Sequence, residues 1–192
     1  MELVATLTPP FNIEQFEDVF KTHYAALFRY VRSIVKDDDQ AKDVLSDMFL
    51  NLWLQKEKLQ IQNIKAYLFR SARNGALKAL SANNTDAITE QCWDISEEAF
   101  NPLERIVAKE AIKAVEQLMN ELPPLRKEII HLRLCGLKNH EIAKALDINE
   151  KKVEYNMREA IEQLSFYMNN RNFDKATIAG GLLAINIIFT LL

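Results

Sequence analysis

Apolar residues recur every three or four positions along most of the chain, which is the spacing of amphipathic α-helices. The first such segment runs from Phe16 to Val35 and the second from Ala41 to Leu54. A third begins near Ile64 and continues to about residue 80. Nothing in this half alternates with period two for long enough to indicate a strand. The pattern therefore predicts a compact helical bundle over residues 1–80.

The helical period breaks between Ser81 and Asn101, where Ser, Asn, Thr and Asp are frequent at the start. Charge marks the same part of the chain, because residues 81–121 carry a net charge of −6 while 1–80 and 122–170 each carry +1. An acidic, solvated linker between two modules has this composition. We therefore expect helical domains at 1–80 and 102–170, a linker at 81–101 and a separate tail at 171–192.

Four helices are expected in the second domain. Pro102 suits the first turn of a helix that Pro123-Pro124 ends, and the next helix, over 125–135, is followed by Gly136 as a C-terminal stop. Helices at 139–146 and 149–169 complete the set. Asn139 and Asn149 are expected to cap them.

The last two of these helices are predicted to form a helix–turn–helix. Asp147 lies in the turn between them and tolerates the left-handed backbone conformation better than most residues other than glycine. Apolar residues on the two helices are placed to face each other across the turn: Ile142, Ala143 and Leu146 opposite Val153, Met157 and Ala160. The predicted fold is thus all-α, with two small helical domains joined by an acidic linker.

Composition limits the function. The chain has 192 residues, 48% of them hydrophobic and 27% charged, which is typical of a folded soluble protein. A net charge of −3 argues against an autonomous nucleic-acid binder. Cys92 and Cys135 form no CxxC pair and suit a reducing cytosol. The three histidines lack metal-ligand spacing and no Gly-rich phosphate loop is present, so we expect neither an enzyme nor a metal or cofactor.

Four strings of the sequence together resemble the extracytoplasmic-function (ECF) sigma factors, a small two-domain branch of the bacterial sigma family. Residues 16–80 are similar to the family's first conserved domain and residues 118–166 to its second. The strings are "FEDVFKTHYAALFRYVRSIV", "DQAKDVLSDMFLNLW", "IKAYLFRSARNGALKAL" and "LPPLRKEIIHLRLCGLKNHEIAKALDIN". The resemblance implies a cytoplasmic protein that binds core RNA polymerase, directs it to promoter DNA, helps open that DNA and is controlled by an anti-sigma factor.

By this resemblance, the second helix docks on the clamp coiled coil of the polymerase's largest subunit. The residues in the matching places are Asp43, Asp47, Phe49 and Trp53. For the two aromatic residues the alternative is packing in the core, and for the two acids it is a solvated helix face. We favour docking for the acids, since they can steer association with a basic surface.

The third helix resembles the family's promoter-melting helix and interleaves basic with aromatic residues, a combination that suits single-stranded DNA. Its candidate residues for the −10 strand are Lys65, Tyr67, Arg70, Arg73, Asn74 and Lys78. The spacing places Tyr67, Arg70 and Asn74 on one face, so Phe69 is expected in the core. The loop at 56–63 is expected to hold a flipped −10 base. An ordinary solvated face is the alternative for the basic residues.

The helix that follows Asp147 is expected to lie in the major groove of the −35 element. Its candidate residues are Asn149, Glu150, Lys151, Lys152, Glu154, Tyr155 and Arg158. Glu154 and Asn156 replace basic residues of the common family string. A glutamate can accept a hydrogen bond from cytosine N4, so these acids can specify a base while weakening overall affinity. We expect that to suit a subunit that polymerase delivers to DNA.

The tail does not match the family pattern. Residues 176–192 contain no charged side chain, and the length of this segment is near the lower limit for a membrane-spanning helix. Gly180-Gly181 and Asn186 weaken that interpretation. The alternatives are a membrane contact, a segment that masks the polymerase or DNA face, a docking site for an anti-sigma factor, and local packing on the second domain. A tail-anchored helix–turn–helix regulator that acts without polymerase is the rival function.

Overall fold

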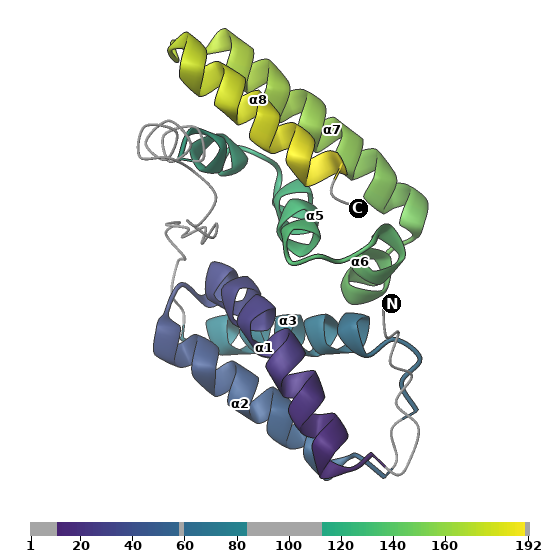
Figure 1. The fold of residues 1–192 in the computed structure, drawn as a ribbon. Helices are drawn as coiled ribbons and strands as arrows, with labels where there is room; N and C mark the ends of the chain where they lie inside the picture. The colour runs from purple at the N-terminus through teal and green to yellow at the C-terminus, as the bar shows by residue number, and fades with distance from the viewer. Residues whose placement is uncertain (1–10, 58–59, 84–112, 191–192) are drawn as a thin grey trace. The chain divides into compact units, whose positions relative to one another are not determined.

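The structure, a computed structural model, describes residues 11–57, 60–83 and 113–190, and every regular element in these ranges is an α-helix (Figure 1). The all-α prediction is therefore confirmed. By their contacts, the described residues up to 83 form one compact unit with 137–150, and residues 113–136 form a second with 151–190. The predicted linker from residue 84 onward, and the helix start at Pro102, lie outside the described residues.

The first unit contains α1 (Ile13–Val35), α2 (Asp38–Leu54) and α3 (Ile64–Asn83), which pack on one another. A capping box starts α1: the Asn12 carboxamide oxygen accepts from the Gln15 backbone N–H at 2.9 Å, and the Gln15 side chain accepts from the Asn12 N–H at 3.1 Å. Lys36, in the left-handed conformation at φ 64°, ends the helix.

The second helix begins three residues before the predicted Ala41. Asp37 is the cause, because its carboxylate accepts from the Gln40 backbone N–H at 2.7 Å and caps the helix there. Asp38 and Asp39 then lie in the first turn, where the helix macrodipole favours negative charge. The acidic run therefore stabilises the start of α2.

Close packing joins α3 to its two neighbours. Phe69 is fully buried, as predicted, and its ring centroid lies 5.4 Å from that of Tyr30 in α1. Gly75 faces α2, where a Cβ atom would lie only 3.0 Å from the Val44 side chain. The glycine therefore allows α3 to approach α2 closely.

The short helix α6 (Asn139–Leu146) belongs to the first unit, where it contacts α3. The prediction that Asn139 caps it is wrong, because Lys138 occupies the cap and Asn139 is the first helical residue. Glu141 supplies the capping group instead: its carboxylate accepts from the Lys138 backbone N–H at 2.9 Å. Asp147 follows the helix in the left-handed conformation, φ 57° and ψ 44°, as predicted.

The second unit contains a helical segment over 113–119, α5 (Pro124–Leu134), α7 (Glu150–Asn170) and α8 (Lys175–Thr190). Gly136 lies just past α5 at φ 79°, which confirms its predicted role as a stop. One stripe of α7 is buried at helical spacing: Val153, Met157, Ala160, Leu164 and Met168.

The apolar tail forms α8, which lies beside α7 (Figure 1). Asp174 starts it by accepting from the Thr177 backbone N–H at 3.0 Å and from the Thr177 hydroxyl at 2.5 Å. Thr177, Gly181 and Ile185 are buried, one turn apart. A Cβ atom on Gly181 would overlap the Met168 side chain, so the glycine permits close contact with α7. Such packing is what the fourth alternative for the tail predicts.

Among the described residues, no helix is long and apolar enough to cross a membrane.

Met168→Ala is expected to lower the free energy of unfolding of the second unit by about 2–3 kcal/mol. The value lies at the low end for a large-to-small core change because α8 can shift toward the vacated volume. Phe166→Ala, on the same helix, removes a larger but 63% exposed side chain and should cost little. Urea denaturation followed by circular dichroism measures both variants. Equal destabilisation by the two would contradict the packing of α8 on Met168.

Candidate nucleic-acid and partner interfaces

The four residues of α2 predicted to bind polymerase have different exposures. Asp43 and Asp47 are exposed and one helical turn apart, on one side of the helix. Phe49 is buried, with 4% of its surface accessible, and Trp53 is half-buried. The acids are therefore available to a partner, whereas the aromatic residues serve first to pack the unit.

An aromatic cluster explains this burial. The Phe49 ring lies between three rings of α1, with centroid distances of 6.1 Å to Phe16, 4.8 Å to Phe20 and 6.4 Å to Tyr24. Trp53 contacts Phe16 at 5.3 Å, and the Lys56 ammonium lies 3.4 Å from the indole centroid. Phe49 thus follows the core-packing alternative, because its ring holds α1 against α2 and leaves little surface for a partner.

Two leucines that sequence reasoning missed extend the acidic side of α2. Leu50 is 55% exposed and Leu54 is 70% exposed. They follow Asp43 by seven and eleven positions, so all four side chains lie along one face. We call Asp43, Asp47, Leu50 and Leu54 the α2 face. The helical spacing of Asp43 and Asp47 could have identified the two leucines, because Leu50 and Leu54 continue the same spacing.

On α3, the residues predicted to bind the −10 strand form a partly exposed face. Arg70, Asn74 and Lys78 are exposed, and Lys65, Tyr67 and Arg73 are half-buried. Leu77, which was not predicted, is 44% exposed and lies seven positions after Arg70 on the same side. The predicted loop at 56–63 is described only in part, because residues 58 and 59 lie outside the described ranges.

The start of α3 and the face next to it contact α6 and its turn. Asn63 caps α3, because its carboxamide oxygen accepts from the Ala66 backbone N–H at 2.8 Å. The amide nitrogen of the same side chain donates to the Glu141 carboxylate at 3.1 Å. Farther along, the Arg70 guanidinium lies 3.6 Å from the Asp147 carboxylate.

Burial lowers the pKa of His23 below its ordinary value of 6.5, and the positive charge of Lys65 lowers it further, while Asp18 and Glu141 oppose the shift. Because the folded state binds the proton less tightly, the unfolded state holds more protons near this pH. The free energy of unfolding is therefore not reduced by His23 above about pH 6.5. It decreases as the pH falls from there toward the lowered pKa of the folded state.

We expect His23→Gln to reduce the gain in unfolding free energy that the wild type shows between pH 5.5 and pH 7.5. Denaturant unfolding of both proteins at the two pH values measures this change in unfolding free energy. The carboxylates titrate in both proteins, so their contribution cancels in the comparison. Identical pH dependence in the two proteins would contradict the lowered pKa.

All seven residues of the region predicted to contact the −35 element are exposed: Asn149, Glu150, Lys151, Lys152, Glu154, Tyr155 and Arg158. Within this set, the Arg158 guanidinium lies 5.7 Å from the Tyr155 ring centroid, a cation–π distance. The first half of α7 thus presents a mixed charged surface with one aromatic ring.

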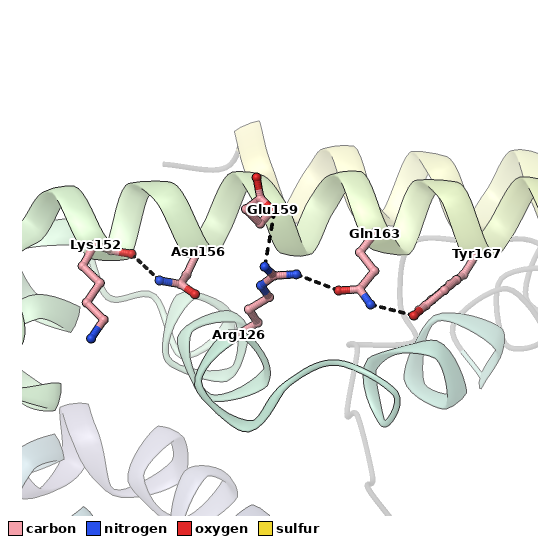
Figure 2. A network of polar contacts seen from close by, with 6 residues as sticks. All are labelled: Arg126, Lys152, Asn156, Glu159, Gln163 and Tyr167. Carbon is pink, nitrogen blue, oxygen red and sulfur yellow. Dashed lines mark hydrogen bonds and ion pairs between the residues drawn. The ribbon is translucent and has the colours of Figure 1, made fainter.

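The other side of α7 is tied to α5 by a polar network (Figure 2). Arg126 donates to Gln163 at 2.9 Å and to Glu159 at 3.2 Å, and Gln163 donates to the Tyr167 hydroxyl at 2.6 Å. Arg126 and Glu159 have side chains only 22% and 30% exposed. Glu159 therefore supports the packing of α7, in contrast to the exposed Glu150 and Glu154.

Asn156, which replaces a basic residue of the family string, donates its side-chain amide to the Lys152 backbone carbonyl at 2.8 Å (Figure 2). The amide is engaged within its own helix, one turn back. The half-buried residue thus adds no charge to the exposed side of α7.

Two models of one protein family match successive parts of the chain. The model of sigma-70 region 2 matches residues 19–85, which include α2 and α3, and the model of sigma-70 region 4 matches residues 112–164. Together they span more than half of the chain. The α8 helix lies beyond both matches.

Individual proteins agree with the family models. The ECF RNA polymerase sigma factor SigX of Bacillus subtilis (strain 168) is 22% identical over 163 residues, covering 81% of this chain and 84% of that protein. The fold is similar to that of CnrH, solved with the cytosolic domain of CnrY, at a TM-score of 0.58 and 21% identity over 82% of this chain and 90% of that one.

A second solved structure, the sigma factor RpoE with the anti-sigma factor NepR from Bartonella quintana, has a TM-score of 0.59 and 16% identity over 83% of this chain and 100% of that one. With both conserved regions present in order, the chain belongs to the sigma-70 family as an ECF sigma factor, the subunit that directs RNA polymerase to promoters.

Proposed function

We propose that the α2 face attaches this sigma factor to core RNA polymerase. Asp43 and Asp47 are exposed and can steer the helix toward a basic surface. Leu50 and Leu54 add apolar area that is costly to leave in water and gains free energy when a partner covers it. The resemblance to the family names the clamp coiled coil of the largest subunit as that surface.

The face of α3 opens the −10 region. Its exposed Arg70 and Lys78 can neutralise phosphates, and the half-buried Tyr67 offers one side of its ring to a base that leaves the duplex. Burial of Phe69 supports this assignment, because it fixes which side of α3 faces away from the core.

The first half of α7 recognises the −35 element in the major groove. Glu150 and Glu154 are exposed and can accept hydrogen bonds from cytosine N4, while Lys151 and Lys152 contact phosphates. The N-terminal end of the helix provides backbone N–H groups for a further phosphate. The near-neutral charge of this surface keeps the free protein from binding DNA tightly before polymerase delivers it.

An anti-sigma factor is the remaining partner. Two structures of similar fold contain sigma factors bound by CnrY and by NepR, which supports control of the same kind here. We place the protein in the cytoplasm with the polymerase and assign it no catalytic activity. Packing of α8 on α7 gives no support to the tail-anchored regulator.

The main support for a role of α3 in promoter opening is the exposure of Arg70, Asn74 and Lys78, while Phe69 on the same helix is buried. We call the exposed side of α3 that includes these three residues the α3 face. Permanganate oxidation of unpaired thymines tests it on a promoter bound by core polymerase and this protein. Tyr67→Ala should reduce the thymine signal about tenfold, since a stacked base contributes about 1–3 kcal/mol. Arg70→Ala should also reduce the signal, because it removes a positive charge that neutralises a phosphate. Both variants should still bind core polymerase.

Lys175→Ala is the control, because it removes an exposed positive charge from α8 instead of α3. It should leave the permanganate signal unchanged. Full thymine reactivity with Tyr67→Ala and Arg70→Ala would contradict the role of α3.

A further inference from the structure

Three exposed residues of α7 lie together on the side that faces away from its buried stripe. At about 100° per residue, Glu154, Arg158 and Tyr155 follow one another in that order within an arc of about 100° around the helix. The buried Val153 and Met157 lie outside this arc. Arg158 therefore lies in the middle of this surface, with an acid on one side and an aromatic ring on the other.

Tyr155 contacts the Arg158 side chain. The guanidinium carbon lies 5.7 Å from the ring centroid, within the range of about 6 Å for a cation–π interaction. Long side chains of a helix point back toward its N-terminus, so the guanidinium reaches over the preceding turn, where the ring lies. The contact restricts the rotamers of Arg158 and holds its charge over the half of α7 that enters the major groove in a helix–turn–helix protein.

Glu154 is the other group within reach of Arg158, because the two residues are four positions apart. Among the residues that the structure describes, however, no ion pair joins them. An ion pair would occupy N–H donors of the guanidinium, whereas a contact with the face of a ring leaves them available. The donors of Arg158 and the carboxylate of Glu154 can therefore both reach base edges.

A guanidinium with available donors matches guanine in the major groove. Its paired N–H groups fit the O6 and N7 acceptors of that base, which is the commonest specific contact between a side chain and a base. Adenine presents an N6 donor where guanine presents O6, so it can accept only one of the two N–H groups. Arg158 is the only arginine between residues 150 and 160, so in this part of α7 the role falls to Arg158.

We propose that Tyr155 is a positioning residue that holds Arg158 against one guanine of the −35 element. The inference rests on the proposed function of α7 and names a base that this function leaves open. Glu154, one turn before Arg158, then faces a neighbouring base pair, where it accepts a hydrogen bond from cytosine N4.

Transcription from a promoter library tests the contact with guanine. Core polymerase and the full chain transcribe a pool in which the −35 element upstream of the protein's own gene is randomised, and sequencing of the transcripts gives the base preference at each position. The wild type should favour guanine over adenine about tenfold at one position. Arg158→Lys keeps the charge but removes the planar pair of donors, so it should abolish this preference and retain the others.

Two variants of Tyr155 test the positioning role. Tyr155→Leu removes the ring and should reduce the same guanine preference about two- to fivefold, within the range for an exposed cation–π contact. Tyr155→Phe keeps the ring and should retain the preference. A purely structural role of Tyr155 would lower transcription from all members of the library equally and leave the guanine preference unchanged.

A modified base tests the contact at one atom. The base 7-deazaguanine, placed at the preferred position, has a C–H group where guanine has the N7 acceptor. It should lower transcription by the wild type about five- to tenfold, because a hydrogen bond to a charged group is lost. The same base should have no effect with Arg158→Ala, since the donor is already absent. Equal sensitivity of the two proteins would overturn the contact.

Phe166→Leu is the matched control for Tyr155→Leu, because it exchanges a 63% exposed ring eleven positions farther along the same helix. It should leave the guanine preference unchanged. An unchanged preference with Arg158→Lys would overturn the assignment of guanine to Arg158, and an unchanged preference with Tyr155→Leu would overturn the positioning role. If the wild type transcribes without preference at any −35 position, the proposed function of α7 itself fails.

Discussion

Phe49→Ala should lower the free energy of unfolding of the first unit by about 3–5 kcal/mol. The ring is 4% exposed and contacts Phe16, Phe20 and Tyr24, so its removal opens a cavity between α1 and α2. Aromatic contacts of this kind add to the loss of buried area. Denaturant unfolding followed by circular dichroism measures the effect.

Leu50→Ala is the matched control for this change. Leu50 is the next residue along α2 but is 55% exposed, so its truncation should alter stability by no more than about 0.5 kcal/mol. A small effect of Phe49→Ala on the free energy of unfolding would contradict the structural role of Phe49. It would favour the alternative in which Phe49 contacts polymerase.

Exchange of both leucines of the α2 face for lysine should weaken binding to core polymerase by about 100- to 1,000-fold. Leu50→Lys and Leu54→Lys together remove two apolar anchors and bring two positive charges to a surface expected to be basic. A loss of this size corresponds to about 3–4 kcal/mol. Fluorescence anisotropy of labelled sigma factor titrated with core polymerase measures the dissociation constant.

Leu183→Lys controls for the general effect of placing lysine on an exposed leucine. Leu183 is 62% exposed, between the values of 55% for Leu50 and 70% for Leu54, but it lies on α8. Its replacement should not change affinity for core polymerase. Equal affinity of the double variant and the wild type would exclude the α2 face from the interface.

Much of the local structure followed from the sequence because local interactions determine it. Helical spacing predicted α1 and α3, and the turn residues Gly136 and Asp147 adopt the left-handed conformation expected of them. The predicted start of α2, at Ala41, is three residues too late. Asp37 caps the helix, so the helix begins before the first apolar residue of the pattern. At α6 the capping group came from Glu141, inside the helix, and not from Asn139.

Long-range packing was harder to predict. The sequence alone left Phe49 and Trp53 between a core role and a binding role, because an apolar residue on a helix can satisfy either pattern. Only the three rings of α1 decide it for Phe49. The same reason applies to the tail, whose uncharged residues fit a membrane or a helix partner equally well until Met168 is seen against Gly181.

The contact between α3 and α6 could not be predicted at all. Periodicity indicates that one face of α6 is buried, but it does not identify the neighbour. Glu141 and Asn63 are ordinary capping residues in isolation, and nothing in their local sequence indicates that they meet across 78 positions.

Run-off transcription tests the central claim most directly. Core polymerase without any other sigma factor is supplied with this protein and with DNA fragments from upstream of its own gene. We predict specific transcripts that require the protein, and that are lost with Arg70→Ala or Tyr67→Ala. Absence of transcripts, together with no binding to core polymerase by the full chain or by a chain ending at residue 171, would contradict the assignment as a sigma factor.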